Sequence, residues 1–242
     1  MSKRVTDFAV LTFDCYGTLI DWERGILQAI RPWMTRHGVS AGDDAVLELF
    51  GECESAEEAA TPGLVYPEIL ARSLKAMAKR WGTVASDDEA ATFGASVKDW
   101  PAFPDSAAAL QYLKRYYKLV ILSNVDRRSF AASNQKLGVE FDAVCTAEDI
   151  GSYKPDARNF AYLLDRLGAQ GIARESILHT AQSLFHDHVP ATRAGLATCW
   201  IDRRHALDGW GATPATETRP SVDFHLTSMA DLVRRHQDDL RA

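Results

Sequence analysis

The sequence predicts an α/β fold, a doubly wound, Rossmann-like parallel sheet core with an inserted helical cap domain. Three observations predict it. An apolar run over residues 8–13 ends in Asp14, which is typical of a buried strand. Residues 21–100 then show the apolar spacing of helices and no strand pattern. From Pro101 onward helical and strand patterns alternate, which favours parallel strands with helices on both faces.

Length and composition are those of a globular chain. The 242 residues are 46% hydrophobic and 25% charged, and the net charge is -6. This acidic balance gives no electrostatic case for binding nucleic acid or an anionic membrane. The four cysteines form no C-x-x-C pair, and no stretch is typical of a signal peptide or a membrane span. A cytoplasmic protein is therefore expected.

The helical insertion is predicted to contain four helices. The first covers residues 22–37, and Gly38 ends it. The others are predicted at residues 44–60, 66–81 and 87–97. The predicted domains are a core of residues 1–19 and 100–242 and a cap of residues 20–99.

The remainder of the core is predicted to alternate between helix and strand. The predicted helices cover residues 106–116, 127–137, 155–167, 187–194 and 228–241. The predicted strands cover residues 118–124, 143–147, 177–181 and 198–201, with a last edge strand at 223–227. Residues 207–221 are rich in Gly, Pro and Thr and are predicted to form a surface loop. Right-handed crossovers place the carboxyl ends of all parallel strands at one edge.

Polar residues follow four of these strands. They are Asp14, the pair Ser123 and Asn124, Lys154, and Asp187. Because open α/β sheets bind ligands at the carboxyl ends of their strands, we expect these side chains to meet. Each has a structural explanation by itself, since Ser-Asn can cap a helix, Lys can lie at the surface and Asp can cap a loop. Their shared position favours a functional site.

The sequence Asp-Cys-Tyr-Gly-Thr-Leu from Asp14 to Leu19 resembles the first motif of the haloacid dehalogenase superfamily, specifically its L-2-haloacid dehalogenase branch. The resemblance covers about residues 1–235, with the motifs in the family's order. It implies a hydrolase in which Asp14 displaces halide from C2 of a small 2-haloalkanoic acid, forming an aspartyl ester that water hydrolyses. Phosphatases of the superfamily carry a second Asp where this chain has Tyr16, so no metal and no cofactor is expected.

The resemblance also assigns roles to the other strand-end residues. Lys154 is expected to hold the pKa of Asp14 down and to lie outside the hydrophobic core, so that its loss removes activity without unfolding the protein. Asp187 is expected to hold Lys154 or to orient the hydrolytic water. The pair at 123–124, just before a helix, is expected to suit an anion. Substrate-binding residues are expected to be Tyr16, Ser123, Asn124 and Trp22, although core packing also explains Trp22, and Thr18 and His186 are candidate orienting residues.

Two departures from the family pattern leave the substrate open. The family places a halide-binding Arg on the cap, and the aligned residue here is Gly51, within a window of five acids and no Lys or Arg. A solvated helix face explains those acids, and a pocket for a cationic group is the alternative. A pocket for a cationic group would favour a hydrolase of the same mechanism that opens a strained cyclic amino acid such as azetidine-2-carboxylate. A Mg-dependent phosphatase and a non-catalytic binding protein are further alternatives, the latter disfavoured by Asp14 and Lys154.

The second departure is a pair of histidines, His186 and His188, on either side of Asp187. Their i, i+2 spacing is poor for shared metal ligation, so no metal site is predicted there. The expected partners are water and a small-molecule carboxylic acid substrate, with no nucleic acid and no membrane. A homodimer is compatible with the sequence.

Overall fold

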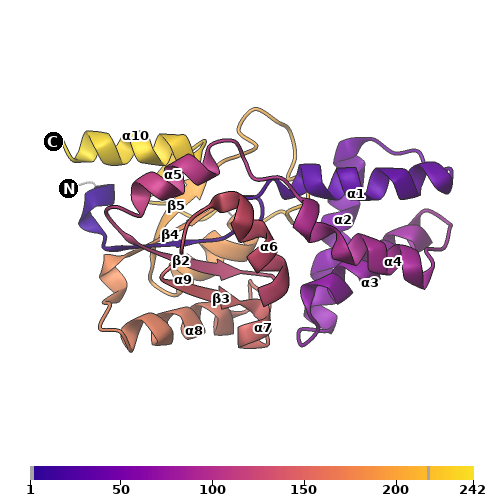
Figure 1. Cartoon of the computed structure of the whole chain (residues 1–242), viewed down its shortest axis with the longest axis horizontal. Helices are drawn as coiled ribbons and strands as arrows, with labels where there is room; N and C mark the ends of the chain where they lie inside the picture. Colours follow the sequence, from indigo (N-terminus) through magenta and orange to yellow (C-terminus); the bar gives the residue numbers. More distant parts are fainter. Residues whose placement is uncertain (1–2, 217–218) are drawn as a thin grey trace.

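A computed structural model describes residues 3–216 and 219–242 (Figure 1). Its centre is a six-stranded sheet of strand order β3-β2-β1-β4-β5-β6 in which every neighbouring pair is parallel. The strands are β1 (Val10–Phe13), β2 (Lys118–Ser123), β3 (Ala143–Thr146), β4 (Ile177–Ala181), β5 (Ala197–Ile201) and β6 (Phe224–Leu226). The predicted doubly wound sheet is therefore confirmed, with β1 at the point where the strand order reverses.

Helices cover both faces of this sheet because side chains alternate along each strand. Leu11 packs in one core cluster with Leu110 of α5, whereas its neighbour Val10 packs in the other with Phe160 of α8. The first face carries α5 (Ser106–Leu113), α6 (Arg127–Leu137) and α10 (Met229–Asp239). The second carries α8 (Ala157–Gly168) and α9 (Val189–Arg193).

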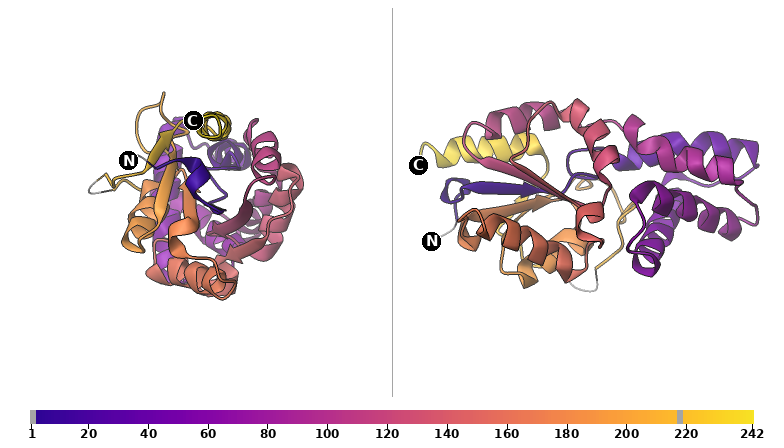
Figure 2. Two further views of the ribbon diagram at one scale, coloured as in Figure 1. Left: turned by 90° about the vertical axis from the view of Figure 1, so that its left-hand side faces the viewer. Right: turned by 60° about the horizontal axis from the view of Figure 1, so that its bottom comes forward.

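The inserted cap is a helical unit that lies beside the sheet (Figures 1 and 2). It consists of α1 (Trp22–Arg36), α2 (Asp43–Ala60), α3 (Tyr66–Arg80), α4 (Asp87–Gly94) and the 3-10 helix η2 (Ala95–Asp99). All residues from 21 to 99 are described, and none of them lies in a strand. The helical cap is thus confirmed, while the exact domain boundaries stay a prediction.

Several elements differ from the prediction at their ends. The third strand stops at Thr146, whose hydroxyl accepts the N–H of Asp149 and so caps a short helix, α7 (Ala147–Ile150), that the sequence patterns missed. The helix predicted from residue 187 begins earlier, as one turn of π-helix, η4 (Leu184–His188), that continues into α9. A 3-10 helix, η1 (Val5–Asp7), precedes the first strand.

The predicted surface loop at residues 207–221 is only partly at the surface. Ala212 is buried, and its N–H donates to Glu23 of the cap helix α1 at 3.0 Å. Arg204 just before it forms an ion pair with the same Glu23 at 2.6 Å. This part of the chain therefore connects the core to the cap, while residues 217–218 lie outside the described residues.

Within the described ranges, no helix combines the length and the apolar character needed to cross a bilayer.

Candidate active site

The polar residues predicted at the strand ends do meet at the carboxyl edge of the sheet. The Lys154 ammonium lies 3.0 Å from Asp14 Oδ1 and 2.6 Å from Asp187 Oδ1, and donates to the Leu122 carbonyl at 3.1 Å. All three charged side chains are buried, with exposed fractions of 6% for Asp14, 2% for Lys154 and 1% for Asp187. Since β1 lies between β2 and β4, residues far apart in sequence share one site.

The turn after β1 fixes the orientation of the Asp14 carboxylate. Gly17 has φ of 90°, and a Cβ there would lie 3.0 Å from the Trp22 indole nitrogen, so the turn requires glycine. The Thr18 hydroxyl donates to Asp14 Oδ2 at 2.7 Å and accepts the Gln182 N–H at 2.9 Å. Thr18 therefore lies where an orienting residue is expected, and each Asp14 oxygen has one protein partner.

The three charges of the cluster influence one another. Burial opposes the charge of Lys154, but Asp14 and Asp187 raise its pKa above the usual value, so it stays protonated. Burial likewise opposes ionisation of Asp187, yet Lys154 and a histidine hold the pKa of Asp187 well below its usual range. For Asp14, burial raises the pKa, and Lys154 only partly offsets this. Lys154 therefore lowers the pKa of Asp14 as expected, but burial has the larger effect and the net pKa is raised.

The histidine beside Asp187 is His179, which sequence reasoning missed. Its Nε2 lies 3.0 Å from Asp187 Oδ1, and its Nδ1 bonds to the Thr12 hydroxyl at 2.8 Å. His179 is fully buried in the middle of β4. A polar ring inside an otherwise buried strand was the signal that could have identified it.

Asn124 positions the Lys154 backbone. Its Oδ1 accepts the Lys154 N–H at 2.6 Å, and its Nδ2 donates to the Lys154 carbonyl at 2.9 Å and to Glu58 of the cap at 3.2 Å. The neighbouring Ser123 hydroxyl is buried, lines a small cavity beside Asp14 and has no hydrogen-bond partner. Asn124 is thus an anchor for the loop that carries Lys154.

The helix predicted at residues 127–137 is confirmed, but Ser123 and Asn124 are not its N-cap. Helix α6 begins at Arg127, and its N-cap is Asp126, whose carboxylate accepts the Ser129 N–H at 2.9 Å. The first N–H groups of the helix are therefore served by a carboxylate, and Ser123 and Asn124 do not present a helix N-terminus to an anion.

The two histidines of the η4 turn point to different places. His186 lines the cavity, its Nδ1 lies 3.2 Å from the Ser183 hydroxyl, and its Nε2 has no partner. Burial lowers the pKa of His186 to about 4, so the ring is neutral near pH 7. His188 instead donates from Nε2 to the Ala181 carbonyl at 2.9 Å. Only His186 is available to a ligand.

Side chains of the cap close the cavity above Asp14. The core contributes Tyr16, whose hydroxyl bonds to Ser133 at 2.9 Å, so that its ring rather than its hydroxyl meets the cavity. The cap contributes Trp22, Glu54, Glu58 and Tyr66. The cavity measures about 30 Å³, room for one or two water molecules. A substrate of several heavy atoms therefore requires the cap or its side chains to move.

Trp22 lines the cavity and packs edge-on against Phe50, so its packing role is confirmed and its substrate-binding role stays a prediction. Sequence reasoning missed the positions of Glu54, Glu58 and Tyr66. The run of five acids was a signal for the two glutamates, although such a run is equally typical of a solvated helix face.

The structure explains why the aligned cap position is Gly51. A Cβ at this residue would lie 2.4 Å from the Ala212 carbonyl oxygen, so backbone from the core occupies the space of a side chain. Two arginines that could have substituted are engaged elsewhere, Arg31 with Asp43 and Arg72 with Glu57. Among the described residues that line the cavity, Lys154 is the one Lys or Arg.

The charged groups beside Asp14 pair with one another. The Lys154 ammonium lies between the Asp14 and Asp187 carboxylates and contacts both. Tyr16 stands where a further carboxylate would be needed, and the described ranges contain no group of three His, Cys, Asp or Glu side chains arranged to hold an ion.

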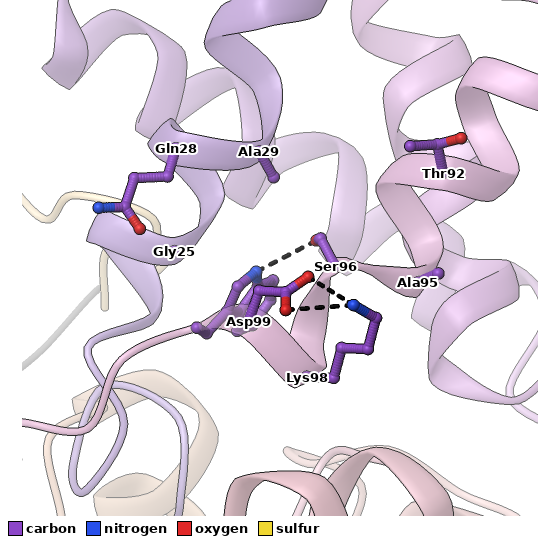
Figure 3. A pocket seen from close by; sticks show the side chains of 9 residues that line it. Gly25, Gln28, Ala29, Thr92, Ala95, Ser96, Lys98 and Asp99 are labelled. Carbon is purple, nitrogen blue, oxygen red and sulfur yellow. Dashed lines mark hydrogen bonds and ion pairs between the residues drawn. The ribbon is translucent and has the colours of Figure 1, made fainter. Parts of the chain in front are cut away.

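A larger pocket of about 440 Å³ lies within the cap, between α1 and the α4–η2 segment (Figure 3). Its charged members, Lys98 and Asp99, pair with each other at 2.8 Å, and the Trp100 indole donates to Ser96 at 3.1 Å. Its charged groups are thus paired with each other and its lining includes no activated nucleophile, so the smaller cavity at Asp14 is the candidate active site.

The buried cap carboxyls should make stability fall as the pH rises. Burial raises the pKa of Glu54 to about 7, so the folded state holds this proton more tightly than the unfolded state does. The stability from this proton is complete below the unfolded pKa and is lost as the pH rises through about 7. Urea unfolding at pH 5 and pH 8 measures this effect. Between these pH values, the free energy of unfolding of Glu54→Gln should rise by about 2–3 kcal/mol relative to that of the wild type.

The matched control is Glu52→Gln on the exposed side of the same helix, where Glu52 pairs with Arg80. The difference in free energy of unfolding between Glu52→Gln and the wild type should not change with pH. A constant difference for Glu54→Gln as well would show that Glu54 is already solvated.

The chain matches the family model of haloacid dehalogenase-like hydrolases over residues 8–179. It is 30% identical over 121 residues to an (S)-2-haloacid dehalogenase of Pseudomonas putida, an alignment that covers 48% of this chain and 52% of the relative. It is 27% identical over 117 residues to the pyrimidine 5'-nucleotidase YjjG of Escherichia coli, covering 46% and 49%. The chain thus spans about half the length of the curated relatives it matches.

Solved structures match over nearly the whole chain. The defluorinating L-2-haloacid dehalogenase Rha0230 has a TM-score of 0.77 at 20% identity, covering 98% of this chain and all of that one. An L-2-haloacid dehalogenase of Xanthobacter autotrophicus with chloropropionic acid covalently bound has a TM-score of 0.75 at 18% identity, covering 94% and 97%. At these identities the structures establish the fold, and the family match covers most of the chain. The protein is therefore a hydrolase that belongs to the haloacid dehalogenase-like family.

Proposed function

We propose that this hydrolase cleaves a bond between carbon and a leaving group, as a 2-haloacid dehalogenase does, with Asp14 as the nucleophile. The observation that carries the proposal is the Asp14 carboxylate itself, buried and fixed by Thr18 on one oxygen and Lys154 on the other. Such a carboxylate can form an ester with substrate carbon. The (S)-2-haloacid dehalogenases among the relatives support a small 2-haloalkanoic acid as the first substrate to test.

The first step forms the ester. One Asp14 oxygen attacks C2 from the side opposite the halide, the C–O bond forms as the carbon–halogen bond breaks, and the halide leaves with the bonding electrons. Lys154 stays charged and holds the carboxylate in place. Because the attack comes from the side opposite the halide, the configuration at C2 is inverted once.

The second step hydrolyses the ester at the Asp14 carbonyl carbon. Two buried acceptors without partners line the cavity and can hold the attacking water, Asp187 Oδ2 and His186 Nε2. Burial keeps His186 neutral, so the free nitrogen of its ring can take the water proton, while Asp187 Oδ2 holds the water. Product alcohol leaves, and the Asp14 carboxylate is restored with one oxygen from water.

EDTA should leave turnover unchanged. The reason is the donor set, in which Lys154 supplies the positive charge between the two carboxylates and Tyr16 replaces an acid. The measurement is chloride release from (S)-2-chloropropionate before and after chelation, with a Mg-dependent phosphatase as the control for effective chelation. Loss of turnover that Mg²⁺ restores would instead support phosphatase activity, the reaction class of the nucleotidase relative.

A second candidate keeps the mechanism and changes the substrate to a strained cyclic amino acid such as azetidine-2-carboxylate. The observation in its favour is the pair of buried acids Glu54 and Glu58 on the cavity wall, opposite the nucleophile. Side-by-side assays of ring opening and halide release separate the two candidates.

A further inference from the structure

Helix α2 places two carboxyl groups inside the active-site cavity. Glu54 and Glu58 are one helical turn apart, and their exposed fractions are only 3% and 5%. Acids with this spacing normally lie on a solvated helix face, and two carboxyls of like charge this close repel each other when both are ionised. Their burial therefore requires an explanation.

The neighbours of these acids are neutral hydrogen-bond donors. The Tyr66 hydroxyl donates to Glu54 at 2.5 Å, and the Asn124 amide donates to Glu58 at 3.2 Å. Within the described part of the chain, neither acid has a Lys or Arg within ion-pair distance. Lys154 is near, but its three N–H groups already serve Asp14, Asp187 and a backbone carbonyl.

The charge of the cavity is consequently unbalanced toward acid. Four carboxyl groups, those of Asp14, Asp187, Glu54 and Glu58, line it with one ammonium, that of Lys154. Burial raises the pKa of both cap acids, which then hold protons until a positive charge arrives. A ligand with only a negative charge would worsen this balance, whereas a cation would ionise the acids and pair with them.

A second observation indicates that a polar ligand fits here. The Ser123 hydroxyl is 2% exposed, lines the same cavity and has no hydrogen-bond partner. A buried hydroxyl without a partner is costly, so a ligand group that bonds to it would be stabilising.

We propose that Glu54 and Glu58 form a subsite for an ammonium group on the substrate. The inference rests on the proposed function, since it names the class of molecule that Asp14 attacks: a small amine-bearing acid or amine, rather than a simple 2-halo acid. The acids of α2 lie across the cavity from the nucleophile, so the ammonium group and the attacked carbon belong to one short molecule.

The test is equilibrium binding, which does not depend on turnover. Three compounds share one three-carbon skeleton: lactate has only the carboxylate, 1-aminopropan-2-ol has only the amine, and isoserine has both. Isothermal titration calorimetry on the wild type should show isoserine binding about ten- to hundredfold more tightly than lactate. In Glu54→Gln/Glu58→Gln that preference should fall to about twofold or less.

Glu52→Gln, on the exposed side of α2, is the matched control and should keep the full preference. Circular dichroism and thermal melting establish that each variant is folded. Equal binding by 1-aminopropan-2-ol and isoserine supports the subsite and shows that the carboxylate is dispensable. Lactate binding as tightly as isoserine, no isoserine binding at millimolar concentration, or a preference that survives in the double variant would each overturn the proposal.

The outcome is separable from the proposed function. Labelling of Asp14 by solvent oxygen tests the nucleophile without reference to the cap acids. A preference for isoserine with an unlabelled Asp14 would retain the subsite and reject the covalent mechanism, and the reverse result would retain the mechanism alone.

Discussion

A single turnover in water enriched in heavy oxygen, with enzyme in excess over substrate, will place the label in Asp14 and leave the product unlabelled. The reason is that water attacks the carbonyl carbon of the aspartyl ester, so product takes its oxygen from the carboxylate. Mass spectrometry of proteolytic peptides reads the result. The same experiment has an internal control, because Glu54, Glu58 and Asp187 line the same cavity and their peptides should stay unlabelled.

Asp14→Asn should lower the rate by more than about 10⁴-fold, because an amide is a far weaker nucleophile than a carboxylate. The variant should remain folded, since the amide is close in shape, its one oxygen can still accept from Lys154, and its NH2 group can donate to the Thr18 hydroxyl oxygen. Label in the product with an unlabelled Asp14 peptide would mean that water attacks the substrate directly. In that case Asp14 would act as a base and the covalent proposal would fail.

Lys154→Met should lose activity by about 10³-fold or more and also lower the free energy of unfolding by about 3–5 kcal/mol. Lys154 is one of the largest fully buried side chains, and its loss leaves Asp14 and Asp187 as buried acids without a cation. The sequence-based expectation that Lys154 does not fill the interior is wrong, and a structural cost of its removal is therefore predicted. Urea unfolding and a turnover assay measure the two effects.

Two further variants separate charge from packing at this site. Lys154→Met/Asp187→Asn removes one acid together with the ammonium and should recover part of the stability but none of the activity. Lys98→Met breaks an exposed pair with Asp99 and should change stability by about 1 kcal/mol or less. Stability of Lys154→Met equal to that of the surface control would show that Asp14 and Asp187 do not need the cation in the folded state.

The sequence predicted the sheet and the nucleophile site because both depend on short-range patterns. Apolar runs of strand length ended in Asp14 and Ser123, and a parallel sheet brings such ends together whatever their separation along the chain. Even the absence of an Arg at Gly51 was visible, although its cause, the Ala212 carbonyl, was not.

What the sequence did not predict depends on long-range contacts. Acids at positions 54 and 58 show the spacing of a solvated face, and only Tyr66 and Asn124, from other elements, reveal that they are buried. The sequence around His179 does not indicate that its side chain contacts Asp187, because the two residues lie in different elements. The burial that raises the pKa of Asp14 likewise depends on residues far from it in the sequence, which no local pattern around residue 14 contains.

The buried part of the loop after β5 has a mechanical consequence. The chain crosses between core and cap twice, and these crossings run together, since the Asp21 N–H donates to the Pro101 carbonyl at 2.8 Å. Two adjacent connecting segments form a hinge, about which the cap could rotate. The Arg204–Glu23 ion pair and the Ala212–Glu23 hydrogen bond join the core to the first turn of α1, just beyond that hinge. On the other side of the cavity the Asn124–Glu58 and Tyr153–Leu64 hydrogen bonds also join core and cap. A rotation that separates cap from core must therefore break contacts on both sides of the cavity, and a molecule held above Asp14 leaves only after they open.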